Sequence, residues 1–249
     1  MLALMLIAQV AGPTLPATDR SDACQRAAVN APVQGETLAN QWIVDGGGYE
    51  ARECLGLALA NQRRWRDAAS AFSAAAGDAE DKDEVRAANL WALAGNAWLA
   101  EGAPDRALTA LDKAIAKETL EGLTLGETHL DRARARVSGG DEAGARADLD
   151  IAVRLAASDP FAWLLSATLA RRMGDLPRAH RDIAEAVRLA GDDPAVQLEL
   201  GNIAAVSGNA DGARTAWERV ITLAPGTARA ATARQALAQF DTPTDTQDQ

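Results

Sequence analysis

The chain has 249 residues, of which 48% are hydrophobic but only 4% aromatic, so its apolar mass is mostly Ala and Leu, which favour helices over sheets. Its formal charge of −10 argues against a whole surface that tracks nucleic-acid phosphates and leaves room only for a small basic pocket, because such binding depends on clustered Lys and Arg. The length fits one elongated domain if helical hairpins stack in an array.

The chain begins with MLALMLIAQVAG, an uncharged apolar run that is too short to span a bilayer. We interpret residues 1–18 as a cleaved signal peptide with Leu15-Pro16-Ala17 as the cleavage region, although no Lys or Arg precedes the run. The predicted location is therefore periplasmic or secreted, with no stable membrane span. The alternative is a buried first helix of a cytoplasmic protein, but Gly12-Pro13 and Pro16 would stop such a helix promptly.

Cys24 and Cys54 are the two cysteines, an even number that favours a disulfide in an oxidising compartment. A bridge between them would close a loop of about 30 residues and stabilise the fold by roughly 3 to 4 kcal/mol. Two separate buried thiols are the alternative. Neither cysteine has a His and a carboxylate nearby in the sequence, so neither is a candidate nucleophile.

Residues 19–48 are predicted to form an N-terminal helical cap. Two short helices are expected over Asp19–Asn30 and Glu36–Asp45, with Trp42 on an apolar side, and Gly46-Gly47-Gly48 joins them flexibly to the next segment. If Cys24 faces Cys54, a disulfide would hold this cap in place.

A 34-residue period follows, and it predicts five helical hairpins. Gly140, Gly174 and Gly208 recur at that interval as turn residues, because Gly accepts the left-handed conformation that closes a helix. In the first hairpin Arg63 replaces the turn glycine. The hairpins are expected over residues 49–82, 88–121, 126–159, 160–193 and 194–227.

The 34-residue period is longer at two places, and a capping helix is predicted after the last hairpin. Extra residues are expected in the connection around Leu120–Gly126 and in the acidic stretch Asp78–Glu84, which is interpreted as a solvated connection or helix edge. Further on, Asp159-Pro160 and Asp193-Pro194 are typical helix starts, a capping carboxylate before a proline at the first helical position. Residues 228–240, capped by Thr227, are predicted to form a C-terminal capping helix, and residues 241–249 a disordered tail.

The repeated residues carry a resemblance to a known family. The last repeat has Leu200-Gly201, Ala204, Gly208, Ala213, Trp217, Val220 and Pro225 in the family's pattern. Over residues 49–227 the chain resembles the tetratricopeptide repeat family, of a bacterial secreted or periplasmic type. The resemblance implies an all-α fold, a right-handed α-solenoid of about five helix hairpins with an N-terminal helical cap and a C-terminal capping helix.

The resemblance also implies where a partner would bind. In this family the first helix of each hairpin lines a concave groove. Asn96, Arg134, Thr168 and Asn202 would form a ladder of hydrogen-bonding groups there, with Arg171 as a second positive charge. The implied ligand is an extended or helical segment with apolar side chains and an acidic group. Ordinary solvated groove residues are the alternative reading. The candidate residues are Asn96, Leu130, Arg134, Phe161, Leu164, Thr168, Arg171, Leu198 and Asn202.

One departure from the family pattern concerns charge. Arg132 stands where the family usually has Leu, and with Asp148 it looks like a family variant that has an acidic residue on the second helix. The resemblance therefore implies a structural ion pair within this hairpin. A partner-binding arginine is the alternative.

Other chemistry-bearing residues have simpler interpretations. Trp91, Trp98, Trp163 and Trp217 stand at packing positions and are expected in the core. His129 and His180 lack Cys or acidic neighbours at metal-ligand spacing, so we expect no metal site and place both at surface or helix-edge positions. The sequence contains no phosphate loop and no nucleophile motif, so neither a cofactor nor a catalytic residue is predicted.

These patterns predict a non-enzymatic protein-protein interaction scaffold of the cell envelope that binds a peptide segment or partner protein in its groove. The first alternative is a structural repeat protein that self-associates into homo-oligomers. An RNA-binding helical repeat is less favoured, because such arrays prefer a 35-residue step and a basic concave face.

Overall fold

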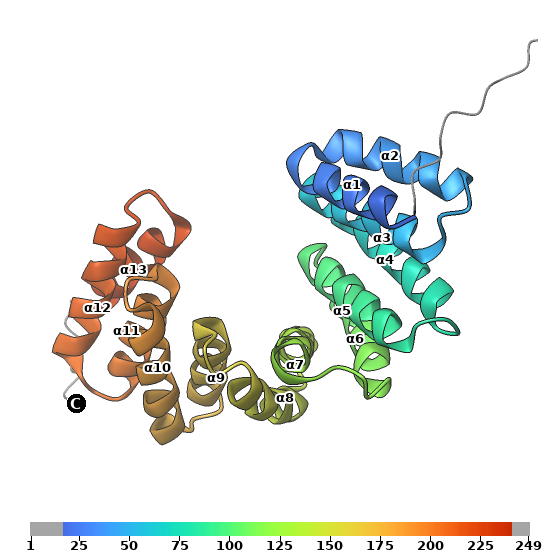
Figure 1. The fold of residues 1–249 in the computed structure, drawn as a ribbon. Coiled ribbons are helices and arrows are strands. Elements are labelled where there is room, and N and C mark those ends of the chain that lie inside the picture. The colour runs from blue at the N-terminus through green and yellow to red at the C-terminus, as the bar shows by residue number, and fades with distance from the viewer. Residues whose placement is uncertain (1–16, 241–249) are drawn as a thin grey trace, which may run out of the picture. The chain divides into compact units, whose positions relative to one another are not determined.

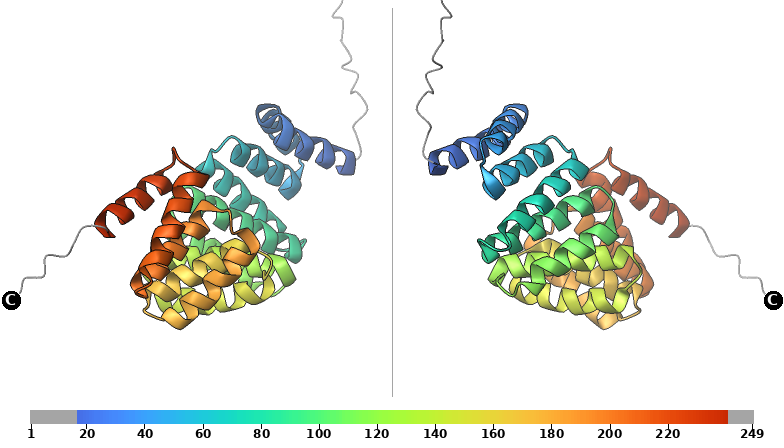
Figure 2. Two further views of the ribbon diagram at one scale, coloured as in Figure 1. Left: turned by 90° about the vertical axis from the view of Figure 1, so that its left-hand side faces the viewer. Right: turned by 90° about the vertical axis from the view of Figure 1, so that its right-hand side faces the viewer.

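A computed structural model describes residues 17–240, and all regular structure in that range is α-helical (Figure 1). The chain divides into two compact units, with the boundary between Ala103 and Pro104, inside the hairpin predicted over residues 88–121. The tail at 241–249 and all but the last two residues of the predicted signal peptide lie outside the described residues. Within each unit, consecutive helices stack side by side (Figures 1 and 2).

The first unit contains the predicted cap and the first hairpin. Its helices are α1 (Ala17–Asn30), α2 (Pro32–Val44), α3 (Gly48–Asn61), α4 (Trp65–Ala79) and α5 (Glu84–Ala100). Both α1 and α2 pack against α3, and α4 packs between α3 and α5. The first helix begins at Ala17, slightly before the predicted start of the cap.

The cap has a small core of its own. A disulfide joins Cys24 of α1 to Cys54 of α3, and both residues are buried with Trp42 of α2. The two cap helices cross closely at Gly35, where an added Cβ would lie 2.5 Å from the Cα of Ala28. The disulfide therefore ties the cap to α3 of the first hairpin, and the crossing packs the two cap helices against each other.

The second unit is a longer stack. Its helices are α6 (Pro104–Ala116), α7 (Gly122–Ser138), α8 (Glu142–Leu155), α9 (Pro160–Arg172), α10 (Leu176–Ala190), α11 (Pro194–Val206), α12 (Ala210–Leu223) and α13 (Ala228–Phe240). The hairpins α7–α8, α9–α10 and α11–α12 follow one another, and α13 covers the last of them. The predicted capping helix is therefore present, and its N-cap Thr227 accepts a hydrogen bond from the backbone of Ala230.

The predicted turns are confirmed. Gly140, Gly174 and Gly208 have φ values of 82°, 79° and 78°, in the left-handed region that favours glycine. Arg63, which replaces the glycine in the first hairpin, adopts φ 59° at the same place. Asp159 and Asp193 accept hydrogen bonds from backbone N–H groups of α9 and α11, as capping residues do.

Glycine also permits close packing inside the hairpins. An added Cβ at Gly56 would lie 2.5 Å from the Phe72 ring, and one at Gly201 would lie 2.5 Å from the Trp217 ring. Each ring therefore rests directly on the backbone of the first helix of its hairpin. Trp91, Trp98 and Trp217 are buried as predicted, whereas Trp163 is half-buried and donates from its indole N–H to the carbonyl of Ala157.

The extra residues between hairpins lie partly elsewhere than expected. The connection predicted around Leu120–Gly126 is in large part helical, and the stretch Asp78–Glu84 contains the end of α4 and the start of α5, as its interpretation as a helix edge allowed. Both α5 and α7 have 17 residues, whereas α9 and α11 each have 13. One additional turn at the start of a first helix takes up most of each insertion. Extending a helix that is already nucleated adds a hydrogen bond for each residue that is fixed, which a loop does not provide.

Candidate binding face of the second unit

The predicted groove residues lie on the first helices of successive hairpins. Arg134 is on α7, Phe161 to Arg171 are on α9, and Leu198 and Asn202 are on α11. Asn96 is exposed on α5 of the first unit, so it does not share a described unit with the others. We use the term binding face for the surface formed by α7, α9, α11 and the start of α13.

Four of the predicted residues line one hollow. Phe161, Leu164 and Leu198 enclose an apolar pocket of about 240 Å³, with Thr168 and Arg229 also in its wall. Phe161 is 43% exposed, and both leucines are half-buried. A concave site lined by apolar side chains with a few polar groups is the usual form of a binding pocket. The groove residues predicted from the sequence therefore include side chains that lie together on an apolar surface, which could contact a partner.

Leu130 was also assigned to the groove, and that assignment is wrong. Its side chain is 5% exposed and packs in the hydrophobic core with Leu149 and Leu169. The repeat position alone suggested exposure, but α8 and α9 cover this residue. Leu130 therefore stabilises the α7–α8 hairpin and offers no surface to a partner.

The polar ladder is engaged within the chain. Arg134 donates to Asp131 over 2.7 Å and lies above the Phe161 ring, 5.7 Å from its centroid. The Thr168 hydroxyl donates to the carbonyl of Leu164 in its own helix. Both side chains therefore spend part of their hydrogen-bonding capacity within the chain.

Glu199 of α11 is the residue that the sequence prediction missed. It is 6% exposed, and its carboxylate accepts hydrogen bonds from Arg171 Nε over 2.6 Å and from Asn202 Nδ2 over 3.3 Å. Arg171 is therefore neutralised across two neighbouring hairpins. The available signal was that Glu199 is the single charge in PAVQLELGNIAAV, since an isolated charge in an apolar helix needs a partner.

A second hollow adjoins the other end of α11. It measures about 310 Å³ and is lined by Arg171, Asn202, Trp217 and Phe240, among others. Asn202 accepts a hydrogen bond from the Trp217 indole over 3.2 Å, and the Trp217 and Phe240 rings meet edge to face with centroids 5.5 Å apart. The capping helix α13 thereby joins the binding face.

A buried charge cluster supports this face from within α7 and α8. The Asp148 carboxylate, 1% exposed, accepts hydrogen bonds from Arg132 over 2.7 and 3.0 Å and from Arg136 over 2.8 Å. The predicted ion pair between Arg132 and Asp148 is confirmed as a contact within the hairpin. The same place in the next hairpin holds Asp182, which is 2% exposed and accepts from the Ser166 hydroxyl over 2.5 Å.

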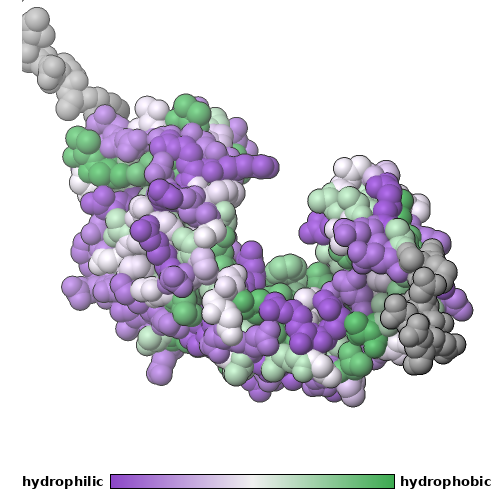
Figure 3. Space-filling view, turned by 180° about the vertical axis from the view of Figure 1, so that it is seen from behind, coloured by the Kyte–Doolittle hydropathy of each residue, from purple (hydrophilic) through white to green (hydrophobic). Residues whose placement is uncertain are grey.

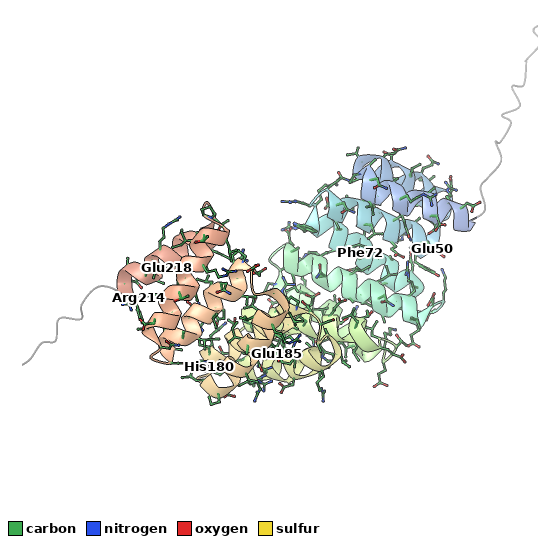
Figure 4. All side chains as sticks on the ribbon, turned by 60° about the vertical axis from the view of Figure 1, so that its left-hand side comes forward. Glu50, Phe72, His180, Glu185, Arg214 and Glu218 are labelled. Carbon is green, nitrogen blue, oxygen red and sulfur yellow. A yellow bond between two sulfur atoms is a disulfide. The ribbon has the colours of Figure 1, made fainter. Side chains whose placement is uncertain are left out.

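His129 belongs to the same cluster, which corrects its predicted surface position. It is 6% exposed, and its Nδ1 lies 2.8 Å from Oδ1 of Asp148. The spacing of His129, Arg132 and Arg136 by three and four residues puts them on one helix face, a signal that the sequence did contain. His180 is exposed on α10, as predicted, with Nε2 2.8 Å from the Ser207 hydroxyl (Figure 4).

The cluster keeps Asp148 ionised. Burial by itself would raise the pKa of Asp148, but hydrogen bonds from His129 and Arg132, together with the charges of Arg132 and Arg136, hold that pKa below its usual value. Because the carboxylate accepts, Nδ1 of His129 is the donor. All members point at one another, so the cluster is structural.

Residues 17–240 contain neither a metal-binding cluster nor a helix suited to cross a bilayer. No group of three or more His, Cys, Asp or Glu side chains in this range could hold a metal ion. None of the helices in this range is both long and apolar enough to cross a bilayer. What the described residues do offer is an apolar surface on stacked hairpins.

The fold and this surface define a class: helical-repeat proteins that act as scaffolds for protein-protein interaction. The sequence model of the tetratricopeptide repeat family matches residues 55–119 and 164–228, which together make up more than half of the chain. The chain therefore belongs to the tetratricopeptide repeat family, whose members are generally non-enzymatic scaffolds. No curated protein sequence matches it.

Solved structures show the same α-solenoid fold. PilW, described as a widely conserved type IV pilus biogenesis factor, is 15% identical, with a TM-score of 0.71 over 87% of this chain and 97% of that one. The pilF protein of Pseudomonas aeruginosa is 14% identical, with a TM-score of 0.68 over 88% and 99%. YrrB, described as having an unusual peptide-binding site, is 17% identical, with a TM-score of 0.59 over 83% and 99%.

Proposed function

We propose that this protein is a non-enzymatic scaffold of the cell envelope that holds a peptide segment of a partner protein on the binding face. The observation that carries the proposal is the apolar pocket, where Phe161, Leu164 and Leu198 stay partly exposed. Arg134, Arg171 and Asn202 of this face already have partners within the chain, whereas the apolar side chains of the pocket have exposed surface that a partner could cover. Burying a large apolar side chain there would contribute about 1.5 to 3 kcal/mol to binding.

An envelope location is supported by the Cys24–Cys54 disulfide, because such bonds persist in oxidising compartments. The peptide-binding site named for YrrB supports the ligand class only through the shared fold. The pocket itself, built from this chain's own residues, is the stronger support.

Peptide selection tests the binding face. Random twelve-residue peptides, displayed as internal fusions, would be selected on the full chain, and we expect the selected peptides to bind a Phe161→Asp, Leu198→Asp variant at least about tenfold more weakly, since two charges would enter the pocket. Met173→Asp is the matched control, because Met173 is 45% exposed but is not part of the pocket. Equal binding to the pocket variant and the control would refute the proposal.

Self-association is a second candidate function, and the cap favours it. Glu36 is the only charged residue of α2, and it faces inward to accept hydrogen bonds from Arg64 and Gln62. The outer side carries Val33 and Val44, which are 70% and 80% exposed. Apolar surface is visible at this end of the first unit (Figure 3). For a chain of charge −10, an uncharged face is where two copies meet with least repulsion.

Light scattering after size exclusion tests this second candidate. We expect the full chain to shift from monomer to dimer as its concentration rises, and a Val33→Glu, Val44→Glu variant to stay monomeric because it places charges in the contact. Gln34→Glu is the control, since Gln34 is exposed on the same helix but lies about 100° around it from Val33, and this variant should still dimerise. A strictly monomeric wild-type chain at high concentration would exclude self-association.

A further inference from the structure

The apolar pocket carries an unbalanced positive charge. Arg229, in the first turn of α13, lies in the pocket wall and is exposed. Within residues 17–240 it has no ion-pair partner, unlike Arg134 and Arg171, which are paired with Asp131 and Glu199. The only acid in the wall, Glu199, is buried and already occupied by Arg171.

The position of Arg229 near the N-terminus of α13 makes the electrostatic potential there more positive. The first turn of α13 contains no acidic residue, so Arg229 stands at the positive end of the helix dipole without a local counter-charge. An arginine at this end is unfavourable unless an anion comes from elsewhere. The guanidinium can give two parallel N–H donors to one carboxylate, which is a strong and directional pairing.

The size of the pocket limits the other part of the ligand. Its volume of about 240 Å³ is the space of roughly eight water molecules. One large apolar side chain fits against Phe161, Leu164 and Leu198, with its backbone left outside at the rim. The apolar floor and the cation at the edge together describe a two-part ligand.

Resting on the proposed binding face, we infer that the pocket recognises a peptide in which a Leu, Ile or Phe side chain fills the floor and a nearby Asp or Glu pairs with Arg229. The acidic group lies within four residues of the apolar one, since both must reach the same pocket. The ligand carboxylate belongs to a side chain inside the peptide. Because the chain as a whole is strongly acidic, this local cation also determines where an acidic partner can dock.

The displayed library provides the probe, because internal fusions carry no free C-terminal carboxylate. Among peptides selected on the full wild-type chain we expect Asp or Glu to be enriched within four positions of Leu, Ile or Phe. The best peptide, made with a C-terminal amide, should bind Arg229→Gln about tenfold more weakly than the wild type at low salt. This difference should shrink as salt is raised, because salt screens the ion pair that only the wild type can form.

A double-mutant cycle makes the assignment specific. Changing the peptide's acid to its amide should cost the same tenfold on the wild-type chain and nothing further on Arg229→Gln. Arg154→Gln is the matched control, because Arg154 is also exposed and without an ion-pair partner in residues 17–240, but lies outside the pocket wall. Its affinity for the peptide should equal that of the wild type.

The outcomes separate this inference from the proposed function. Selected peptides that lack acids, or that bind Arg229→Gln as well as the wild type while failing on the Phe161→Asp, Leu198→Asp variant, would overturn the role of Arg229 and leave the binding face intact. Failure to select any peptide, or full binding to that pocket variant, would overturn both. Since Arg229 is exposed, its substitution leaves the fold unchanged, which circular dichroism verifies.

Discussion

An Asp148→Asn substitution is expected to destabilise the second unit by about 3 to 5 kcal/mol. Asp148 is 1% exposed and receives hydrogen bonds from Arg132, Arg136 and His129. The amide has almost the same shape but no charge, so two arginines would be left beside a buried group that cannot balance them. Chemical denaturation followed by far-UV circular dichroism measures the loss as a lower midpoint.

Asp150→Asn is the control for this prediction. Asp150 is on the same helix and also pairs with two arginines, Arg146 and Arg178, but its side chain is 47% exposed. An exposed ion pair contributes about 0 to 1 kcal/mol, so this variant should unfold close to the wild type. If both variants lost the same stability, burial of the Asp148 cluster would not be the cause.

The effect of Asp148 should also depend on pH. Its pKa in the folded chain is below the value of about 3.9 expected in the unfolded chain. The stabilisation is therefore fully present above the unfolded pKa and is lost as the pH falls through the folded one. The difference in unfolding free energy between wild type and Asp148→Asn should be constant near pH 6 and shrink below about pH 4. A difference that stayed constant down to pH 3 would contradict this.

Much of the fold could be predicted because its signals are local. A glycine in the left-handed conformation and an Asp-Pro helix start act within a few residues, so Gly174, Asp159 and Asp193 marked boundaries that the structure confirms. The insertion around Leu120–Gly126 was misplaced for the opposite reason. Whether Gly122 and its neighbours form a loop or a helical turn depends on what they pack against, which the sequence does not display.

The candidate site was predicted less completely, because some of its charged residues have partners in other repeats. Repeat positions identified the helix face that bears Phe161, Leu164 and Leu198. They could not show that Glu199 binds Arg171 from the next hairpin, 28 residues away. Nor could they show that Arg229 of the capping helix enters the same pocket. The position of a residue within its repeat determines which way its side chain points. Whether a charged side chain is paired depends instead on contacts between repeats.

Breaking the Cys24–Cys54 bond is expected to lower the stability of the cap by about 3.5 kcal/mol, as the closed loop of 30 residues implies. The bond ties α1 to α3 through the small cap core. Hydrogen exchange of α1 amides should therefore speed up by several hundredfold when a reductant is added. Amides of α10, in the other unit, serve as the internal control and should not change.

The Cys24–Cys54 bond also allows a test of the proposed cellular location of the protein. A Cys24→Ala, Cys54→Ala variant should show fast exchange in α1 with or without reductant, which separates the bond from other effects of the reagent. In intact cells, both thiols should resist alkylation until the chain is reduced, because only an oxidising compartment maintains the bond. Ready alkylation would contradict the envelope location. It would also mean that the cap is held by the packing around Trp42 and by hydrogen bonds such as those that Glu36 accepts from Arg64 and Gln62, and slow exchange in the alanine variant would be the matching result.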